Sequence, residues 1–240
     1  MPEIATGCDT RPYVIIATMA VKQRTRTRGA AAAAVLTLVL GTVTATEQTP
    51  SSSTAAFDDA YRRAQLANAG LNTLTADFTE STTSSLLARP IVAHGTLAVQ
   101  RPSRVILRYS EPESRVLFID GDHMTMTWPS RQLRQQTDIA RAQARVQRYF
   151  VRGSAEELRR EFDVELRTTS ERPGTQEVRL TPKRKQIRET LRVLDLWIDP
   201  ANSLLSAMRM TFANGDTKTL TLSRVVPNPA LGPDVFSVER

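Results

Sequence analysis

The fold is decided by residues 95–128, which read GTLAVQRPSRVILRYSEPESRVLFIDGDHMTMTW and contain four short β-like segments. Apolar and polar residues alternate in these segments, most regularly in Met124–Trp128, and a period of two is typical of a strand with one buried face. Turn-forming residues separate them, at Arg101-Pro102, Glu111-Pro112 and Asp120-Gly121-Asp122. Successive strands are therefore expected to pair as antiparallel hairpins, so that one sheet face is continuously apolar.

The rest of the chain extends this sheet. Residues 71–83 are expected to pass from a helix end into a strand, and residues 131–137 to form another. Turn signals between the last strands are Asp199-Pro200-Ala201-Asn202 and Asn214-Gly215, and Asn-Gly is among the strongest short-range hairpin markers. The predicted class is mainly β (α+β), one large curved antiparallel sheet with a few helices on its apolar face. The later strands are predicted at 164–169, 176–182, 190–199, 204–213 and 217–226.

Three helices are predicted from apolar side chains at helical spacing. The first covers residues 57–71 and has Asp58 and Asp59 in its first turn, where acidic side chains interact favourably with the helix dipole. The second covers 139–152, and the arginines opposite its apolar side are most simply a solvated face. The third, at 154–162, opens with the Ser-Ala-Glu-Glu pattern of a capping box.

The first 45 residues have the organisation of a secretory signal. A basic stretch precedes a short apolar one, and Val43-Thr44-Ala45 supplies the small side chains that a signal peptidase reads. Met19 is a more natural start than Met1, so residues 1–45 are expected to be a leader and cleaved signal peptide; the alternative is a retained membrane anchor. The Thr/Ser-rich residues 46–55 are expected to be a flexible tether, which leaves 56–240 as a single domain.

The net charge of +7 does not indicate a nucleic-acid-binding protein. Removal of residues 1–45 takes away five basic and two acidic residues, which lowers the net charge to +4, and no segment combines arginines with aromatic side chains that would stack on bases. Cys8 precedes the apolar part of the leader, so it cannot be a lipoprotein acylation site, and the mature chain has no cysteine. We expect a soluble exported protein without disulfides.

Residues with catalytic potential are scarce. The two histidines, His94 and His123, are too few for a metal cluster. Asp120, Asp122 and His123 together would fit a metal or acid/base site, but Asp-Gly-Asp at a hairpin tip is typical of a turn. The sequence has no Gly-rich phosphate loop and no nucleophile elbow. We therefore predict no catalytic residue, no metal, no cofactor and no enzymatic activity.

Flexible apolar residues are frequent on the predicted inner face of the sheet. Methionine adapts to irregular apolar partners, so two interpretations stay open. The face is either an ordinary core packed against the helices, or the wall of a cavity for acyl chains that the helices cover incompletely. The residues that would line such a cavity are Leu97, Val99, Leu107, Tyr109, Met124, Met126, Trp128, Met208, Met210, Phe212, Leu220 and Leu222.

Short motifs follow one another between Phe57 and Val238 in an order that is informative, although each motif alone is weak. After an N-terminal helix come Ala76-Asp77-Phe78-Thr79-Glu80, Gly95-Thr96-Leu97, Arg101-Pro102, Tyr109 followed by Pro112, Asp120-Gly121, Leu180-Thr181-Pro182, Asn214-Gly215 and the segment from Asn228 to Phe236. This order and spacing resembles the periplasmic outer-membrane lipoprotein carrier proteins (LolA). The chain departs from that family at Glu80, where glutamine is usual.

The resemblance implies an unclosed β-barrel with a helical lid. It also implies a periplasmic carrier that shields the acyl chains of lipoproteins in an apolar cavity and takes them from an inner-membrane ABC transporter to an outer-membrane acceptor; we expect a monomer. Arg101 matches the family's arginine that bonds backbone carbonyls of the lid and favours the closed, empty state, unless it is only a surface residue before a turn proline. The alternatives are a lipid or glycolipid carrier and a lipoprotein-sensing regulatory domain of an envelope stress pathway.

Overall fold

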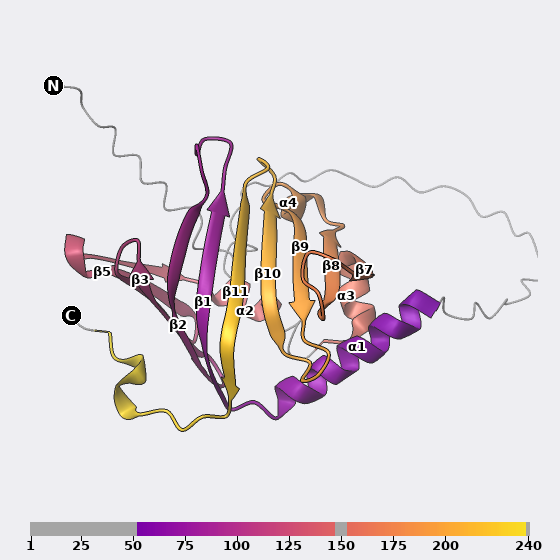
Figure 1. Ribbon diagram of the computed structural model, residues 1–240, viewed down its shortest axis with the longest axis horizontal. Helices are drawn as coiled ribbons and strands as arrows, with labels where there is room; N and C mark the ends of the chain where they lie inside the picture. Colours follow the sequence, from indigo (N-terminus) through magenta and orange to yellow (C-terminus); the bar gives the residue numbers. More distant parts are fainter. Residues whose placement is uncertain (1–51, 147–152, 239–240) are drawn as a thin grey trace, which may run out of the picture.

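One antiparallel sheet of eleven strands forms the centre of the protein (Figure 1). The computed structural model describes residues 52–146 and 153–238. The strands are β1 (Thr73–Thr83), β2 (Ile91–Gln100), β3 (Arg104–Glu111), β4 (Arg115–Asp120), β5 (His123–Trp128), β6 (Leu133–Asp138), β7 (Phe162–Thr168), β8 (Gln176–Pro182), β9 (Leu191–Ile198), β10 (Leu205–Phe212) and β11 (Thr217–Pro227).

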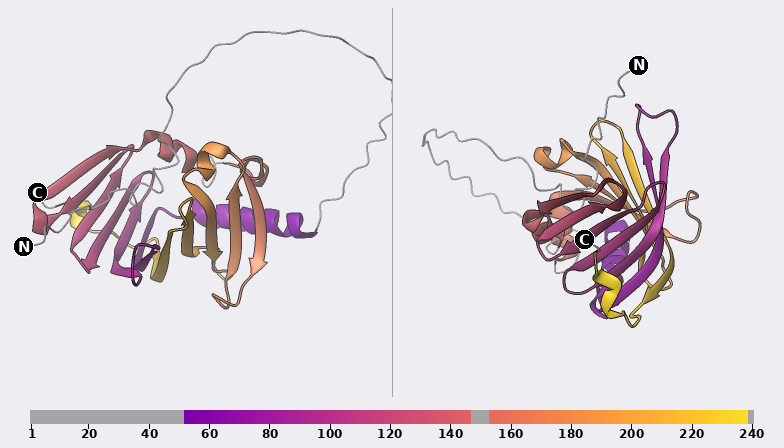
Figure 2. Two further views of the ribbon diagram at one scale, coloured as in Figure 1. Left: turned by 90° about the horizontal axis from the view of Figure 1, so that it is seen from above. Right: turned by 90° about the vertical axis from the view of Figure 1, so that its left-hand side faces the viewer.

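The strand order across the sheet is β6-β5-β4-β3-β2-β1-β11-β10-β9-β8-β7. The chain leaves the centre along β1 to β6, crosses to the opposite edge and returns along β7 to β11, so that its first and last strands pair in the middle. The sheet curves, and its edge strands β6 and β7 do not pair with each other (Figure 2). The mainly β fold with an unclosed barrel, predicted from the sequence, is confirmed.

Helices accompany both halves of the sheet. In the described residues they are α1 (Ser52–Ala69), α2 (Ala140–Val146), α3 (Ala155–Glu161) and α4 (Lys185–Arg188), with 3-10 turns η3 (Pro129–Arg131) and η5 (Pro233–Phe236). The long helix α1 contacts α3 and β7 and crosses the half of the sheet that ends in β7 (Figure 2). No helix in the described ranges combines the length and apolar character needed to cross a bilayer.

The first helix starts earlier than the sequence-based prediction. It begins at Ser52, so residues 52–55 of the expected tether are helical, and Asp58 and Asp59 lie beyond the first turn. No glycine or proline stands between Ser52 and Phe57, so nothing in the local sequence stops the helix from extending toward the N-terminus.

The second helix can be compared with the prediction only in part, and the third is shorter than predicted. α2 is described as far as Val146, and residues 147–152 of the predicted helix lie outside the described part of the chain. Phe162 was expected in the third helix but adopts extended backbone and begins β7. Its side chain is fully buried and starts the alternation that continues at Val164 and Leu166. The predicted capping box is confirmed, because Ser154 and Glu157 exchange two hydrogen bonds of 3.1 Å.

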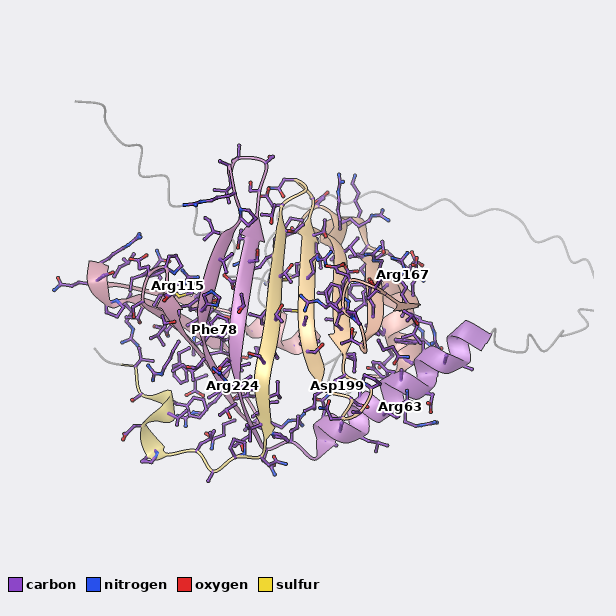
Figure 3. The ribbon with its side chains drawn as sticks, in the orientation of Figure 1. Arg63, Phe78, Arg115, Arg167, Asp199 and Arg224 are labelled. Carbon is purple, nitrogen blue, oxygen red and sulfur yellow. The ribbon has the colours of Figure 1, made fainter. Side chains whose placement is uncertain are left out.

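Two clusters of buried side chains cover the inner face of the sheet. The first cluster lies over β1 to β5 and is completed by Ile139 and Ala142 of the α2 segment. The second lies over β7 to β10 and is completed by Phe57 of α1 and Leu158 of α3. We refer to these two parts of the sheet as the first half and the second half; Phe78 and Arg115, labelled in Figure 3, belong to the first half.

Gly95 allows the first half to pack tightly around an aromatic pair. A Cβ atom at this position would lie 2.7 Å from the Phe78 ring and 2.1 Å from the Arg108 carbonyl oxygen, both far inside van der Waals contact. With no side chain on β2 there, Phe78 reaches Tyr109 edge-to-face, with ring centroids 4.9 Å apart. The Gly-Thr-Leu motif of the sequence is thus a packing requirement of the first half.

Candidate functional site

A cavity of about 380 Å³ lies beneath α1 in the second half of the sheet. Ligand pockets usually measure roughly 300–1,000 Å³ and combine an apolar lining with a few polar groups, and this cavity has that composition at the small end of the range. It is lined by Phe57, Ala60, Tyr61, Ala64, Gln65, Asn68, Arg101, Leu158, Gln176, Val178, Leu180, Leu191, Leu194, Leu196, Ile198, Ser203, Leu205, Met208 and Met210.

Strand register builds the apolar floor of the cavity. Two rows of opposed residues run across β8, β9 and β10, and they are Val178–Leu196–Met208 and Leu180–Leu194–Met210. Opposed residues of antiparallel strands share a face of the sheet. Because each strand alternates with period two, both rows face α1, and the outward positions between them carry residues such as Arg209 and Asp195.

The roof is the face of α1 that carries small side chains. Its lining residues recur every three or four positions from Phe57 to Asn68, with Ala60 and Ala64 in the middle. Alanine side chains fill little of the space between helix and sheet. Space therefore remains between the sheet and this face of α1, where Ala60 and Ala64 line the cavity.

Polar contacts fasten α1 to the segment that leads into α3. The Tyr61 hydroxyl and the Gln65 amide both donate to the Gly153 carbonyl oxygen, at 3.3 and 2.5 Å. The Arg159 guanidinium forms a bidentate pair with Asp58, whose longer bond is 3.2 Å. These groups are part-buried or exposed, where such bonds are weak. The polar attachment of the roof is thus weak, while Phe57, buried in the second cluster, anchors its N-terminal part.

The polar lining residues of the cavity come from α1 and from strand ends. Gln65 and Asn68 lie on α1, while Arg101 follows β2, Gln176 begins β8 and Ser203 precedes β10. Arg101 is the one charged residue of the lining. Its backbone N–H donates to the Asn72 carbonyl oxygen at 2.9 Å, and its exposed guanidinium makes no hydrogen bond to another described residue. The cavity wall thus carries a single positive charge.

Three of the predicted site residues line the cavity, and they are Arg101, Met208 and Met210. Phe212, two positions further along β10, packs against the second cluster. These four residues lie in or beside the second half of the sheet. The sequence pattern alone did not separate them from the other predicted residues.

The other predicted residues lie in the first half. Tyr109, Met124, Met126 and Trp128 are buried there, each with no more than 6% of its surface exposed. Val99 pairs with Val105 between β2 and β3. The partly buried members that pack against the first cluster are Leu97, Leu107, Leu220 and Leu222.

A buried charged cluster, which the sequence analysis missed, lies where the first half of the sheet meets β11. Glu80 of β1 accepts hydrogen bonds from the Lys218 ammonium at 3.1 Å and from the Tyr109 hydroxyl at 3.0 Å, and its carboxylate lies 3.6 Å from the Arg115 guanidinium. Burial lowers the pKa of Lys218, and Glu80 partly counteracts this. The sequence could have indicated this cluster through Lys218, because the period-two alternation of β11 places Lys218 on the same inward face as Leu220.

A second buried ionic group lies on the outer face of the second half. Asp195 and Glu177 are almost fully buried, and the Arg179 guanidinium donates to Asp195 at 2.6 Å. Burial, together with the Asp195 carboxylate, raises the pKa of Glu177. This group faces away from α1 and does not contribute to the cavity.

The turn at Asp120 and Asp122 joins β4 to β5 as predicted, with Gly121 at φ +58°. Across the described residues, no group of three or more His, Cys, Asp or Glu side chains is arranged to hold a metal ion. A second concavity of about 380 Å³ lies against β1, β2 and β3, and its lining includes Leu97 and Arg108. The cavity beneath α1 has the more apolar lining of the two and is the candidate site for an apolar ligand.

An open curved sheet with an apolar cavity under a helix defines a class of binding and carrier proteins. The sequence identifies the family within that class. Residues 69–239 match the family model described as outer membrane lipoprotein carrier protein LolA, and the chain belongs to this family. The resemblance noted from the sequence motifs is thereby confirmed.

Several solved structures are similar to this chain at low sequence identity. An uncharacterised conserved protein of Thermus thermophilus has a TM-score of 0.50 at 7% identity, over 77% of this chain and 94% of that one. Lipoprotein LppX of Mycobacterium tuberculosis gives 0.48 at 14% identity, over 74% and 98%. A LolA superfamily protein of Nitrosomonas europaea gives 0.38 at 11% identity, over 78% and 98%. No curated protein sequence matches this chain.

Proposed function

We propose that this protein carries lipoproteins through the periplasm, with their acyl chains shielded in the cavity beneath α1. The observation that carries the proposal is an apolar cavity of about 380 Å³ in a member of a lipoprotein-carrier family. In the full scheme, an inner-membrane ABC transporter loads the carrier and an outer-membrane acceptor unloads it. The carrier acts as a monomer after removal of residues 1–45.

The energetics of acyl chains explain why a shielded cavity is needed. Each methylene withdrawn from water contributes about 0.8 kcal/mol, so an exposed chain would return to the nearest membrane or aggregate. The two apolar rows of the cavity floor offer a substitute for the bilayer interior. Met208 and Met210 adapt to chains that differ in shape.

Cargo transfer also needs a roof that can move. We propose that α1 is that roof, because exposed or part-buried contacts fasten it. Arg101 stands in the cavity wall next to the C-terminal part of α1. In the closed, empty state its guanidinium would bond backbone carbonyls of α1, and incoming cargo would displace it.

A release assay tests the proposal directly. The exported and purified protein is added to spheroplasts whose inner membrane holds newly made lipoproteins, and the supernatant is analysed for one-to-one complexes. Ala64→Phe places a large side chain in the cavity and should reduce release at least tenfold. Ala56→Phe, at an exposed position of the same helix, is the matched control and should release lipoproteins normally.

The other outcomes discriminate between the hypotheses. Extracted lipid that co-purifies with the protein, without any released lipoprotein, would favour the lipid or glycolipid carrier. Equal release by the Ala64→Phe variant would show that cargo does not occupy this cavity. Arg101→Leu tests the latch separately, because loss of the latch should leave cargo on the carrier and slow its transfer to an acceptor.

A further inference from the structure

One end of the sheet combines exposed apolar and basic side chains. Thr217 pairs with both Thr83 and Thr211, so the β1–β2 turn and the β10–β11 turn lie at the same edge. Phe212 pairs with Leu191, which places α4, just before β9, at that edge as well. Figure 1 shows these connections along the upper side, with the β1–β2 hairpin projecting furthest.

The β1–β2 hairpin carries an apolar tip. Six large apolar side chains are exposed in the described residues, and three of them, Leu86, Ile91 and Val92, belong to this hairpin. Leu86 has 92% of its surface exposed. Leu86 lies in the projecting turn, and Ile91 and Val92 begin the strand that leaves it. Scattered exposed apolar residues are normal, but three such residues at one end of a hairpin favour an interaction site. No acidic residue occurs between Ser81 and Ala93.

Basic side chains surround this tip. Arg89 is exposed on the hairpin itself, and Lys185 and Arg188 are exposed on α4. These three make no ion pair with any other described residue. β1 and β9 are separated by two strands, which places α4 about 14 Å from the hairpin at the usual strand spacing.

Acidic residues at this end balance the charge only in part. Lys183 pairs with Asp163 at 3.3 Å, and Arg184 pairs with Glu161. The remaining carboxylates are Glu189 and Asp216, and the Asn214 amide donates to the latter at 2.6 Å. Among the described residues, three basic side chains without an ion pair, Arg89, Lys185 and Arg188, therefore stand against two carboxylates without a basic partner, Glu189 and Asp216.

We infer that this end of the molecule docks on the surface of an anionic bilayer. The tip residues enter the interface between headgroups and acyl chains, while the basic residues lie over the anionic headgroups. Each basic residue near such a surface strengthens binding about fivefold, and the buried apolar area adds to this. The inference goes beyond carriage of cargo, because it uses no residue of the cavity.

Vesicle flotation tests the inference with the exported and purified protein used in the release assay. The probes are phosphatidylcholine vesicles with and without phosphatidylglycerol. The wild-type protein should float with the anionic vesicles and much less with the neutral ones. Leu86→Ser combined with Ile91→Thr should lower binding about tenfold, and Lys185→Gln with Arg188→Gln about 25-fold. Leu133→Ser, at an exposed leucine of the edge strand β6, is the control and should bind normally.

Three results would overturn the inference. The first is the absence of wild-type binding to anionic vesicles, the second is equal binding by the tip variant and the Leu133→Ser control, and the third is the loss of flotation in the Ala64→Phe variant. Ala64→Phe separates this inference from the proposed function, because a protein with a filled cavity should still float. If Ala64→Phe abolishes flotation, the protein binds the vesicle lipids in its cavity and not through the hairpin end. Circular dichroism confirms that every variant is folded.

Discussion

The two halves of the sheet have the same strand pattern but differ in what covers them. In the first half, Ile139 and Ala142 of the α2 segment join the buried cluster directly. In the second half, α1 lies above the strands with alanines in the middle of its inner face, and a cavity remains. A period-two pattern therefore defines an apolar face, while the covering helix decides whether that face becomes core or cavity.

Each half contains two methionines at alternate positions of one strand. Met124 and Met126 of β5 are at most 5% exposed and belong to the first cluster. Met210 of β10 is equally buried, at 4%, but Met208 is only partly buried, and both line the cavity. The same residue type thus fills space in one half and borders it in the other. This contrast can be tested by experiments on each half and on the junction between them.

The largest effect is expected at the junction. Glu80→Gln should lower the free energy of unfolding by about 3–5 kcal/mol, because it leaves Lys218 and Arg115 buried without the carboxylate. Urea denaturation would measure this. Adding Lys218→Met should recover a large part of the loss, since an apolar side chain avoids the desolvation of the ammonium. A Glu80→Gln variant as stable as the wild type would contradict the role of the cluster.

The Glu80→Gln variant should also change how stability depends on pH. Without the carboxylate, the pKa of Lys218 falls further below its ordinary value of 10.5. Folded Lys218 then loses its proton at a pH where the unfolded chain still holds it, so the unfolded state binds more protons and stability rises with pH. The unfolding free energy lost through Glu80→Gln should therefore be greatest at neutral pH and become smaller toward pH 10.5. Subtracting the wild-type dependence of unfolding free energy on pH removes the contributions of other titrating groups, such as Tyr61.

A matched pair of methionine variants compares the two halves. Met126→Ala should cost about 2–5 kcal/mol of unfolding free energy, because it opens a void in a filled core. Met208→Ala should cost less, because this side chain is only partly buried and borders existing space. In the lipoprotein release assay, Met208→Ala should instead have the larger effect and Met126→Ala the smaller one. Equal losses of stability would show that the two halves are packed alike.

A smaller effect is expected at the attachment of the roof. Asp58→Asn weakens the pair with Arg159, which is part-exposed, so the unfolding free energy should fall by no more than about 1 kcal/mol. Amide hydrogen exchange should nevertheless become faster in α1 and stay unchanged in β3 and β4. Faster exchange throughout the sheet would mean that α1 is integral to the core.

The smallest expected effect is an increase in unfolding free energy when Glu177, on the outer face of the second half, is replaced. The raised pKa of Glu177 means that the folded protein binds more protons than the unfolded chain at pH values above 4.5, so stability falls as the pH rises through this window. Glu177→Gln should therefore be more stable at pH 7 by up to about 1 kcal/mol. Thermal unfolding at pH 7 and at pH 4 would measure the difference, which should vanish at the lower pH.

The sequence predicted the strands well because each carries its own alternation and its own turn residues. Asn214-Gly215 and Asp120-Gly121 both form the expected turns, with both glycines at positive φ. Helix ends were predicted less well. At Ser52 the helix continues through residues with no local stop signal, and at Phe162 burial in the sheet decides the conformation.

The position of the cavity could not be predicted from strand patterns. Met124 and Met208 occupy equivalent alternating positions, and only the spatial order of the strands shows that α1 lies above one and the α2 segment beside the other. The ionic cluster was missed for a related reason. Glu80 and Lys218 lie 138 residues apart, and neither has a charged partner within its own strand.

The pairing of β1 with β11 also has a consequence for the folding pathway. Contacts between distant parts of a chain form slowly, because a long loop must close first. During synthesis β11 is the last strand to emerge, so β1 to β6 and β7 to β10 can form their hairpins before the centre of the sheet exists. Until β11 arrives, β1 presents an unpaired edge that invites pairing with another chain. β11 therefore both completes the sheet and covers two strand edges, those of β1 and β10, that would otherwise be open to pairing with another chain.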